Sequence, residues 1–169
     1  MIINARESGK SVIGICGGYQ MMGIMISDPD GVEGDIRQLP GLGILPVSTI
    51  LTPTKITRQV QFRFLDYGQI CEGYEIHMGN TESKSPLTQN TDGVQDGCLV
   101  DERCFGSYIH GILDNPAVID YILAPYLAHF SKSDFDYRAF KESQYDELAV
   151  WLRKHVDIDR IYKIMMNYD

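Results

Sequence analysis

One cysteine of this sequence stands in a setting that suits nucleophilic chemistry. Cys16 has Gly14 two residues before it and Gly18 two residues after it, with Gly17 between. This Gly-x-Cys-x-Gly spacing is typical of a nucleophile elbow, a sharp strand-to-helix turn at which related hydrolases carry serine. Glycine tolerates the crowding and the unusual dihedrals of such a turn. The same residues also fit a buried structural cysteine, because free cysteine is among the most buried residue types.

A second candidate group is His110, in the segment Phe-Gly-Ser-Tyr-Ile-His-Gly-Ile-Leu-Asp-Asn over 105–115. The segment predicts a strand that ends at His110, just before a glycine and a loop. An imidazole beside the elbow of a neighbouring strand could take the proton of the Cys16 thiol and later deliver it to a leaving amine. A histidine in a turn is more often structural, and only the accompanying elbow favours the catalytic interpretation.

A third segment, Glu-Gly-Tyr-Glu-Ile-His-Met-Gly-Asn-Thr over 72–81, carries two further polar groups. Strand alternation places Glu75 and His77 on one face and Tyr74 and Ile76 on the other. The Glu75–His77 pair could bind a substrate, orient another group or form an ion pair. We do not predict a zinc site, because three convergent protein ligands cannot be identified.

The elements that must position these groups follow from hydrophobic periodicity. A buried strand before Cys16 leads into a helix over 19–26, and a further helix starts at Asn115-Pro116, where proline suits the first turn. The C-terminal part predicts helices over 136–155 and 159–168. Strand patterns occur at 43–51, 55–65, 69–78, 98–100 and 104–110.

Composition narrows the class of protein. A chain of 169 residues suits one domain with an adequate core. The net charge of −8 and the lack of a basic stripe argue against a nucleic-acid partner. No apolar run approaches the ~20 residues needed to cross a bilayer, and the first residues do not resemble a signal peptide. We therefore expect a cytoplasmic protein with no membrane partner.

The number and spacing of the cysteines indicate which metal and disulfide chemistry to expect. The chain has four cysteines and no CxxC pair, so we expect no structural metal and, in a cytoplasm, free thiols. Three of them lie in strand-like sequence and are predicted to be small core residues: Cys71, Cys98 and Cys104.

Together, the three segments resemble a known family. Cys-Gly-Gly-Tyr-Gln-Met-Met-Gly, Glu-Gly-Tyr-Glu-Ile-His-Met-Gly and Tyr-Ile-His-Gly-Ile-Leu-Asp-Asn, in this order, are similar to the glutamine amidotransferase domain of cobyric acid synthases, in the cobalamin-pathway branch of the class I amidotransferases. The resemblance runs from about residue 4 to 128. It implies an α/β, flavodoxin-like fold with a mostly parallel central sheet flanked by helices, an antiparallel extension and a helical C-terminal segment.

The resemblance also implies roles for the residues. Cys16 would attack the side-chain amide of glutamine, and His110 would be its acid/base partner, so that a γ-glutamyl thioester forms, ammonia leaves and glutamate is released. The backbone amide of Gly17 is one expected oxyanion donor. The surrounding oxyanion and substrate-binding set is expected to comprise Gly17, Gly18, Tyr19, Gln20, Glu75 and His77.

The implied partners lie outside this sequence. In the family, ammonia passes to a synthetase domain that uses ATP and Mg²⁺ to amidate the corrinoid adenosylcobyrinic acid a,c-diamide, so no cofactor is expected in residues 1–169. We expect a single amidotransferase domain truncated at its N-terminus, with an α/β core over 1–130 and a helical segment over 131–169. A glycine-containing turn that supplies a second oxyanion amide in the family would precede Met1, and losing one such donor costs ~100- to 1000-fold in rate. The isolated chain is therefore expected to be weakly active or inactive.

One position departs from the wider class, and further interpretations fit the same residues. Many class I amidotransferases carry glutamate two residues after the catalytic histidine, where this chain has Ile112, so the group that orients His110 is unassigned and Glu75 is a candidate. An amidotransferase subunit for peptidoglycan lipid precursors shares the Cys-Gly-Gly-Tyr-Gln elbow. A non-catalytic docking or regulatory domain of the same fold would also carry these motifs, and a cysteine hydrolase or peptidase would have a similar elbow.

Overall fold

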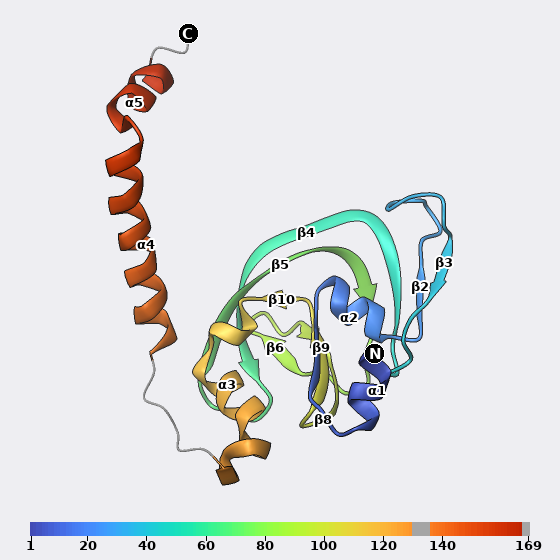
Figure 1. Cartoon of the computed structure of the whole chain (residues 1–169). Helices are drawn as coiled ribbons and strands as arrows, with labels where there is room; N and C mark the ends of the chain where they lie inside the picture. Colours follow the sequence, from blue (N-terminus) through green and yellow to red (C-terminus); the bar gives the residue numbers. More distant parts are fainter. Residues whose placement is uncertain (130–135, 167–169) are drawn as a thin grey trace. The chain divides into compact units, whose positions relative to one another are not determined.

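The computed structural model describes residues 1–129 and 136–166 of the chain. These residues belong to two compact units, Met1–Phe130 and Ser131–Asp169 (Figure 1). Each unit is considered by itself.

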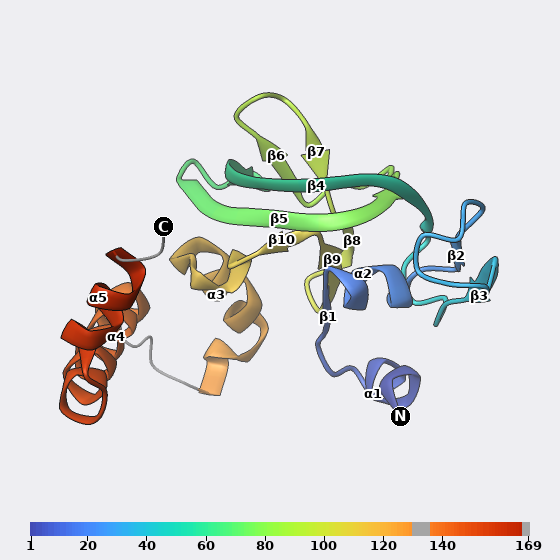
Figure 2. The ribbon, with the colours of Figure 1, turned by 90° about the horizontal axis from the view of Figure 1, so that it is seen from above.

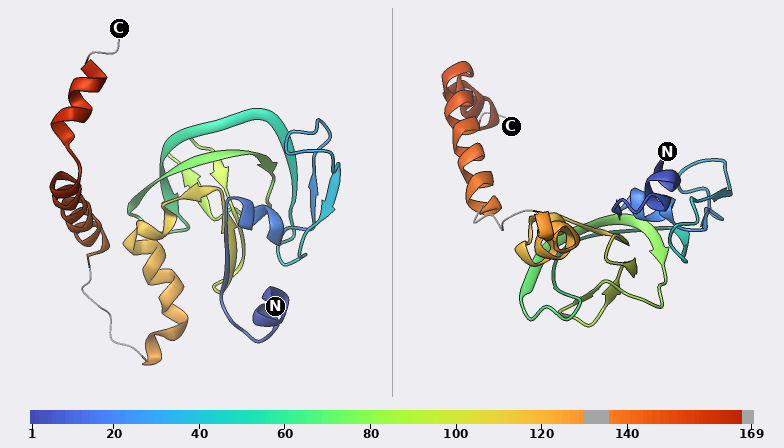
Figure 3. Two further views of the ribbon diagram at one scale, coloured as in Figure 1. Left: turned by 45° about the horizontal axis from the view of Figure 1, so that its top comes forward. Right: turned by 60° about the horizontal axis from the view of Figure 1, so that its bottom comes forward.

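A three-stranded sheet carries the elbow of the first unit. Its strands lie in the order β1 (Val12–Ile15), β9 (Cys104–Ser107) and β8 (Cys98–Asp101). β1 and β9 pair in parallel, with Ile15 opposite Ser107, and β8 and β9 pair antiparallel. The short helix α1 (Ile2–Glu7) precedes β1, and α2 (Gly17–Met22) follows it directly, as the blue strand and helix in Figure 3 show.

A second sheet is built on two long strands, β4 (Ser48–Phe64) and β5 (Ile70–Thr81), which run side by side in Figure 2. β5 also pairs with β10 (Ile109–His110), and β4 pairs with β2 (Met25–Ser27). The remaining short strands of this sheet are β3 (Gln38–Pro40), β6 (Thr88–Asn90) and β7 (Gln95–Asp96). Because β9 and β10 are separated only by Tyr108, the chain crosses there from the first sheet to the second.

The predicted α/β class and the helical C-terminal part are confirmed, but the expectation of a mostly parallel sheet is wrong. Among the described strands only β1 with β9 and β2 with β4 pair in parallel. The cause is connection length: five residues join β4 to β5, and a parallel pair needs a crossover of a dozen or more.

The helix predicted over 19–26 is also shorter than expected. α2 ends at Met22, the N–H of the following residue, Gly23, bonds to the Gln20 carbonyl, and residues 25–27 form β2 instead. Ile24 donates its N–H to the Val47 carbonyl at 2.7 Å, and Ile26 pairs with Thr49. Pairing with β4 therefore outweighs the helical spacing of the apolar side chains in this segment.

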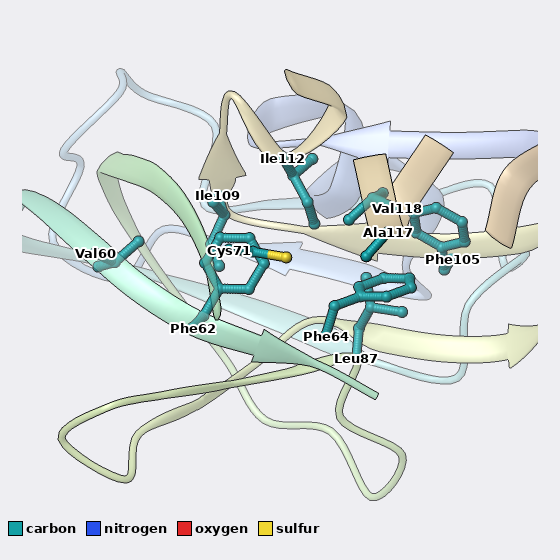
Figure 4. Packing of buried hydrophobic residues seen from close by; sticks show 10 residues of the cluster. All are labelled: Val60, Phe62, Phe64, Cys71, Leu87, Phe105, Ile109, Ile112, Ala117 and Val118. Carbon is teal, nitrogen blue, oxygen red and sulfur yellow. The ribbon is translucent and has the colours of Figure 1, made fainter. Parts of the chain in front are cut away.

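Two apolar clusters hold the first unit together. The helix α3 (Pro116–Leu123) packs on the larger cluster through Ala117 and Val118. The 3₁₀ helix η2 (Ala124–His129) follows α3 along the chain. Figure 4 shows the ten buried members of the larger cluster: Val60, Phe62, Phe64, Cys71, Leu87, Phe105, Ile109, Ile112, Ala117 and Val118. Ile112 lies in the 3₁₀ helix η1 (Ile112–Asp114). The smaller cluster packs α2 against the first sheet through Tyr19, Met22, Leu45, Val47, Cys98, Cys104 and Tyr108.

The second unit consists of α4 (Tyr137–His155) and α5 (Ile158–Met166). Asp136 caps α4, because its carboxylate accepts the backbone N–H of Ala139 at 3.0 Å. The last residues of the helix predicted over 159–168 lie outside the described residues. Over the described part of the chain, no helix has the length and apolarity to cross a membrane.

Candidate active site

The predicted elbow is present, and its backbone is strained at the cysteine. Cys16 stands between β1 and α2 with φ 53° and ψ −115°, a positive φ that residues other than glycine rarely adopt. Its N–H donates to the Ser107 carbonyl at 2.9 Å, and its carbonyl accepts the Gln20 N–H at 3.2 Å. Such strain costs of the order of 1–3 kcal/mol and persists only where the surroundings enforce it.

The thiol of Cys16 is accessible, unlike the other thiols of the chain. Cys16 is half-buried, whereas the remaining cysteines are free and buried, as predicted: Cys71, Cys98 and Cys104. The Cys16 Sγ donates to the Ile76 carbonyl of β5 at 3.5 Å. Gly17 and Gly18 form the first turn of α2, where N–H groups have no partner within the helix, and the positions of their absent side chains are open.

β5 brings His110 to the same region. His110 lies opposite Tyr74 in the β5–β10 pair, and the two rings stack with centroids 5.0 Å apart and planes 8° apart. The Tyr74 ring and the Ile76 carbonyl are two residues apart on β5, so one short segment of this strand contacts both His110 and the Cys16 thiol. Among the described residues the buried Nε2 of His110 has no hydrogen-bond partner.

No carboxylate among the described residues bonds to the His110 ring. Ile112 is buried in the apolar core, as its type requires. Glu75 lies opposite Ile109 rather than His110, so its side chain is on the other face of the sheet. Its Oε2 accepts the Arg58 Nε at 2.6 Å. The structure therefore does not bring Glu75 to His110, and stacking on Tyr74 together with strand pairing fixes the ring instead.

The other predicted residues fall into two groups. Gln20 donates through Nε2 to the Tyr108 hydroxyl at 3.3 Å, and His77 stacks on the Tyr108 ring with centroids 3.8 Å apart. Gln20 and His77 thus meet at Tyr108. Tyr19, in contrast, is fully buried in the smaller apolar cluster, and burial raises the pKa of its phenol. Tyr19 is therefore a core residue of the elbow.

A pocket of about 290 Å³ opens on the face of β5 that carries Glu75 and His77. Arg58, from β4, supplies its positive charge, and its hydrogen bond with Glu75 raises the Arg58 pKa. Asp96 and Tyr108 are among the other polar residues of the lining. The sequence did not indicate Arg58 or Asp96, because their approach to Glu75 depends on strand register.

An α/β fold in which a strained cysteine stands between a strand and a helix is typical of enzymes with a nucleophile elbow. Residues 1–118 match the family of CobB/CobQ-like glutamine amidotransferase domains, and the chain belongs to this family.

The most informative relatives are whole enzymes. The chain is 55% identical over 173 residues to the cobyric acid synthase of Bacteroides fragilis and 52% identical over 174 residues to that of Phocaeicola vulgatus. It is 38% identical over 179 residues to the cobyric acid synthase of Listeria monocytogenes. Each alignment covers at least 97% of this chain but only 35% of the relative. The chain is thus a glutamine amidotransferase domain of the type found in cobyric acid synthases and spans about a third of their length.

Proposed function

We propose that this domain hydrolyses glutamine at Cys16 and delivers ammonia to a synthetase. The observation that carries the proposal is the strained elbow, which holds an accessible thiol beside the strand on which His110 stacks. A buried structural cysteine would need neither the positive φ nor the exposure. Membership of a family of glutamine amidotransferase domains supports the choice of glutamine.

The chemistry follows from the two side chains. The Cys16 Sγ attacks the carbonyl carbon of the glutamine side-chain amide, and its proton passes to His110. The C–N bond then breaks as His110 returns the proton to the leaving nitrogen, which departs as ammonia. Water attacks the γ-glutamyl thioester, the C–S bond breaks, and glutamate leaves as the thiol is restored.

Neighbouring groups would bind the substrate. The N–H of Gly17 lies at the start of α2, next after the nucleophile, and would donate to the oxyanion. Arg58 and Glu75 are paired with each other on the face of β5 opposite His110, so we do not assign them to the charged groups of glutamine. Gln20, which lies on α2 directly after the elbow, and His77 meet at Tyr108 and would contribute polar contacts to the substrate there.

The wider reaction is inferred from the relatives. Since these are cobyric acid synthases of which this chain spans about a third, we propose that ammonia reaches a synthetase domain, fused or separate. There ATP and Mg²⁺ would activate the carboxylates of a corrinoid, adenosylcobyrinic acid a,c-diamide, for amidation in cobalamin biosynthesis. This domain would then need no cofactor of its own.

Covalent labelling tests the nucleophile. A diazo-ketone analogue of glutamine should label the chain once, at Cys16, as mapped by mass spectrometry of peptides. Cys16→Ser should abolish the label, whereas Cys98→Ser, at a buried cysteine, should retain it. Labelling that survives Cys16→Ser contradicts the assignment. If Cys16 is not labelled and the protein joined to its synthetase releases no glutamate, the domain is a non-catalytic one.

A further inference from the structure

The point at which the chain leaves one sheet for the other lies between the two proposed catalytic residues. Ser107 ends β9, whose neighbours are β1 and β8, and Ile109 begins β10, whose neighbour is β5. A strand that changes sheets interrupts its ladder, so backbone donors at the crossing need other partners.

Asp96, the last residue of β7, supplies these partners. Its carboxylate accepts the Tyr108 N–H, at 3.1 Å to Oδ2, and the Ser107 hydroxyl at 2.5 Å. The Ser107 hydroxyl oxygen in turn accepts the Ile109 N–H at 3.0 Å. One carboxylate therefore holds three successive residues of the crossing, and we call this set of bonds the Asp96 clamp.

The Asp96 clamp reaches the nucleophile through the same serine. The Ser107 carbonyl accepts the N–H of Cys16 at 2.9 Å, while its side chain is held by Asp96. Ser107 is fully buried. His110 follows three residues later, fixed to β5 by pairing with Tyr74. The position of Ser107 thus sets where Cys16 and His110 stand relative to each other.

The stability of the fold alone does not explain why a carboxylate, rather than an uncharged side chain, stands at position 96. Burial raises the pKa of Asp96, and the negative charge of Glu75 on β5 acts in the same direction, against the hydrogen bonds from Ser107 and Tyr108. An apolar or amide side chain would avoid that desolvation. What the carboxylate offers is a charged acceptor: Oδ2 accepts both the Ser107 hydroxyl and the Tyr108 N–H, Oδ1 lies 3.3 Å from the same N–H, and hydrogen bonds to a charged oxygen are stronger than those to a neutral amide.

We propose that Asp96 is a positioning residue of the amidotransferase site, which fixes the separation of Cys16 and His110 by holding Ser107 and Tyr108 at the crossing between the sheets. The proposal rests on glutamine hydrolysis at Cys16. It assigns Asp96 no contact with the reacting atoms.

Steady-state kinetics of Asp96→Asn, Ser107→Ala and the double variant test the proposal, with each protein joined to its synthetase. A misplacement of about 1 Å costs roughly 100-fold in rate, so we expect kcat for glutamate release to fall by about that factor in either single variant. KM for glutamine should stay unchanged in Ser107→Ala, because Ser107, unlike Asp96, does not line the pocket on β5. The double variant should be no slower than the slower single variant, since both substitutions act on the bond between the Ser107 hydroxyl and Asp96.

Asp101→Asn is the matched control. The Asp101 carboxylate accepts the Arg103 N–H at 2.9 Å in the turn between β8 and β9, at the opposite end of β9 from the crossing. This variant should lower Tm while leaving kcat unchanged. A fall in kcat of Asp96→Asn that only tracks the loss of folded protein, or additive effects in the double variant, would overturn the proposal.

A second measurement does not depend on turnover. The rate at which iodoacetamide alkylates Cys16, mapped by mass spectrometry, should fall in Asp96→Asn and Ser107→Ala and stay at the wild-type value in Asp101→Asn. Equal alkylation rates in all four proteins would refute the clamp. If the wild type releases no glutamate and takes no diazo-ketone label, the proposed function fails, while the alkylation rates still decide whether Asp96 positions the thiol.

Discussion

The fit of α2 against β1 makes Gly14 the most sensitive glycine of the elbow. A Cβ at Gly14 would lie 2.7 Å from the Met22 Sδ, 2.8 Å from the Tyr19 N and 2.9 Å from the Gly18 C. The Met22 side chain can turn aside. The other two atoms are backbone of the first turns of α2, so Gly14→Ala must push the helix away from the strand.

Overpacking a well-packed core costs about 1–3 kcal/mol, and a clash with backbone belongs to the upper half of that range. We therefore expect Gly14→Ala to lose roughly 2–3 kcal/mol of unfolding free energy, which corresponds to a fall in Tm of roughly 4–12 °C for a protein of this size. Thermal unfolding followed by circular dichroism measures the shift. Alkylation of Cys16 by iodoacetamide should also change in rate, because the thiol stands at the start of the displaced helix.

Gly17→Ala is the control, three residues further along the same elbow. A Cβ at Gly17 would have no heavy atom within 4 Å, and alanine is the better helix former by up to about 1 kcal/mol. Its Tm should equal or exceed that of the wild type. If Gly14→Ala and Gly17→Ala unfold at the same temperature, the close packing of strand and helix does not stabilise the elbow as argued.

Two further predictions concern charged groups. Arg58→Gln leaves Glu75, which is only 3% exposed, without its cation, and it should lower the free energy of unfolding in urea by about 1–3 kcal/mol. Glu75→Gln should lower it by less, because no buried charge remains. The reverse order of the two variants would contradict this account. Hydrogen bonds from the backbone N–H groups of Glu33 and Val32 lower the pKa of Asp28. The stability that the Asp28 carboxylate confers is therefore present at neutral pH. It is lost as the pH falls from about 4, the ordinary pKa of aspartate, through the lowered pKa of Asp28. Asp28→Asn should accordingly be less stable than wild type at pH 7 and equal to it in strong acid, and a pH-independent difference between their urea midpoints would refute the assignment.

Local sequence determined the elbow, whereas strand register determined the rest of the site. The turn at Cys16 is formed by neighbouring residues between β1 and α2, so the glycine spacing was sufficient to predict an elbow there, although the Ser107 contact was not predicted. Alternation along β5 likewise placed Glu75 and His77 on one face, which the pocket confirms. The stacking of His110 on Tyr74 and the approach of Arg58 to Glu75 depend on which residues face each other across strands, and no sequence pattern reports that.

The failed expectations have the same origin. Helical spacing over 19–26 was overridden at Gly23, because a β4 backbone was available to pair with the following residues. Asp96 lies in a segment that shows only turn signals, and its importance follows from the crossing at Tyr108, a contact between distant parts of the chain.

The positive φ of Cys16 bears on how this domain would evolve. Glycine would adopt the same backbone without strain, so Cys16→Gly should be tolerated by the fold better than most substitutions. A lineage that no longer needed glutamine hydrolysis would meet little resistance to that replacement and would gain stability from it. A cysteine that is kept at this strained dihedral therefore indicates continuing selection for its thiol. A cysteine at an unstrained position would not indicate this, because replacing it would bring no gain in stability.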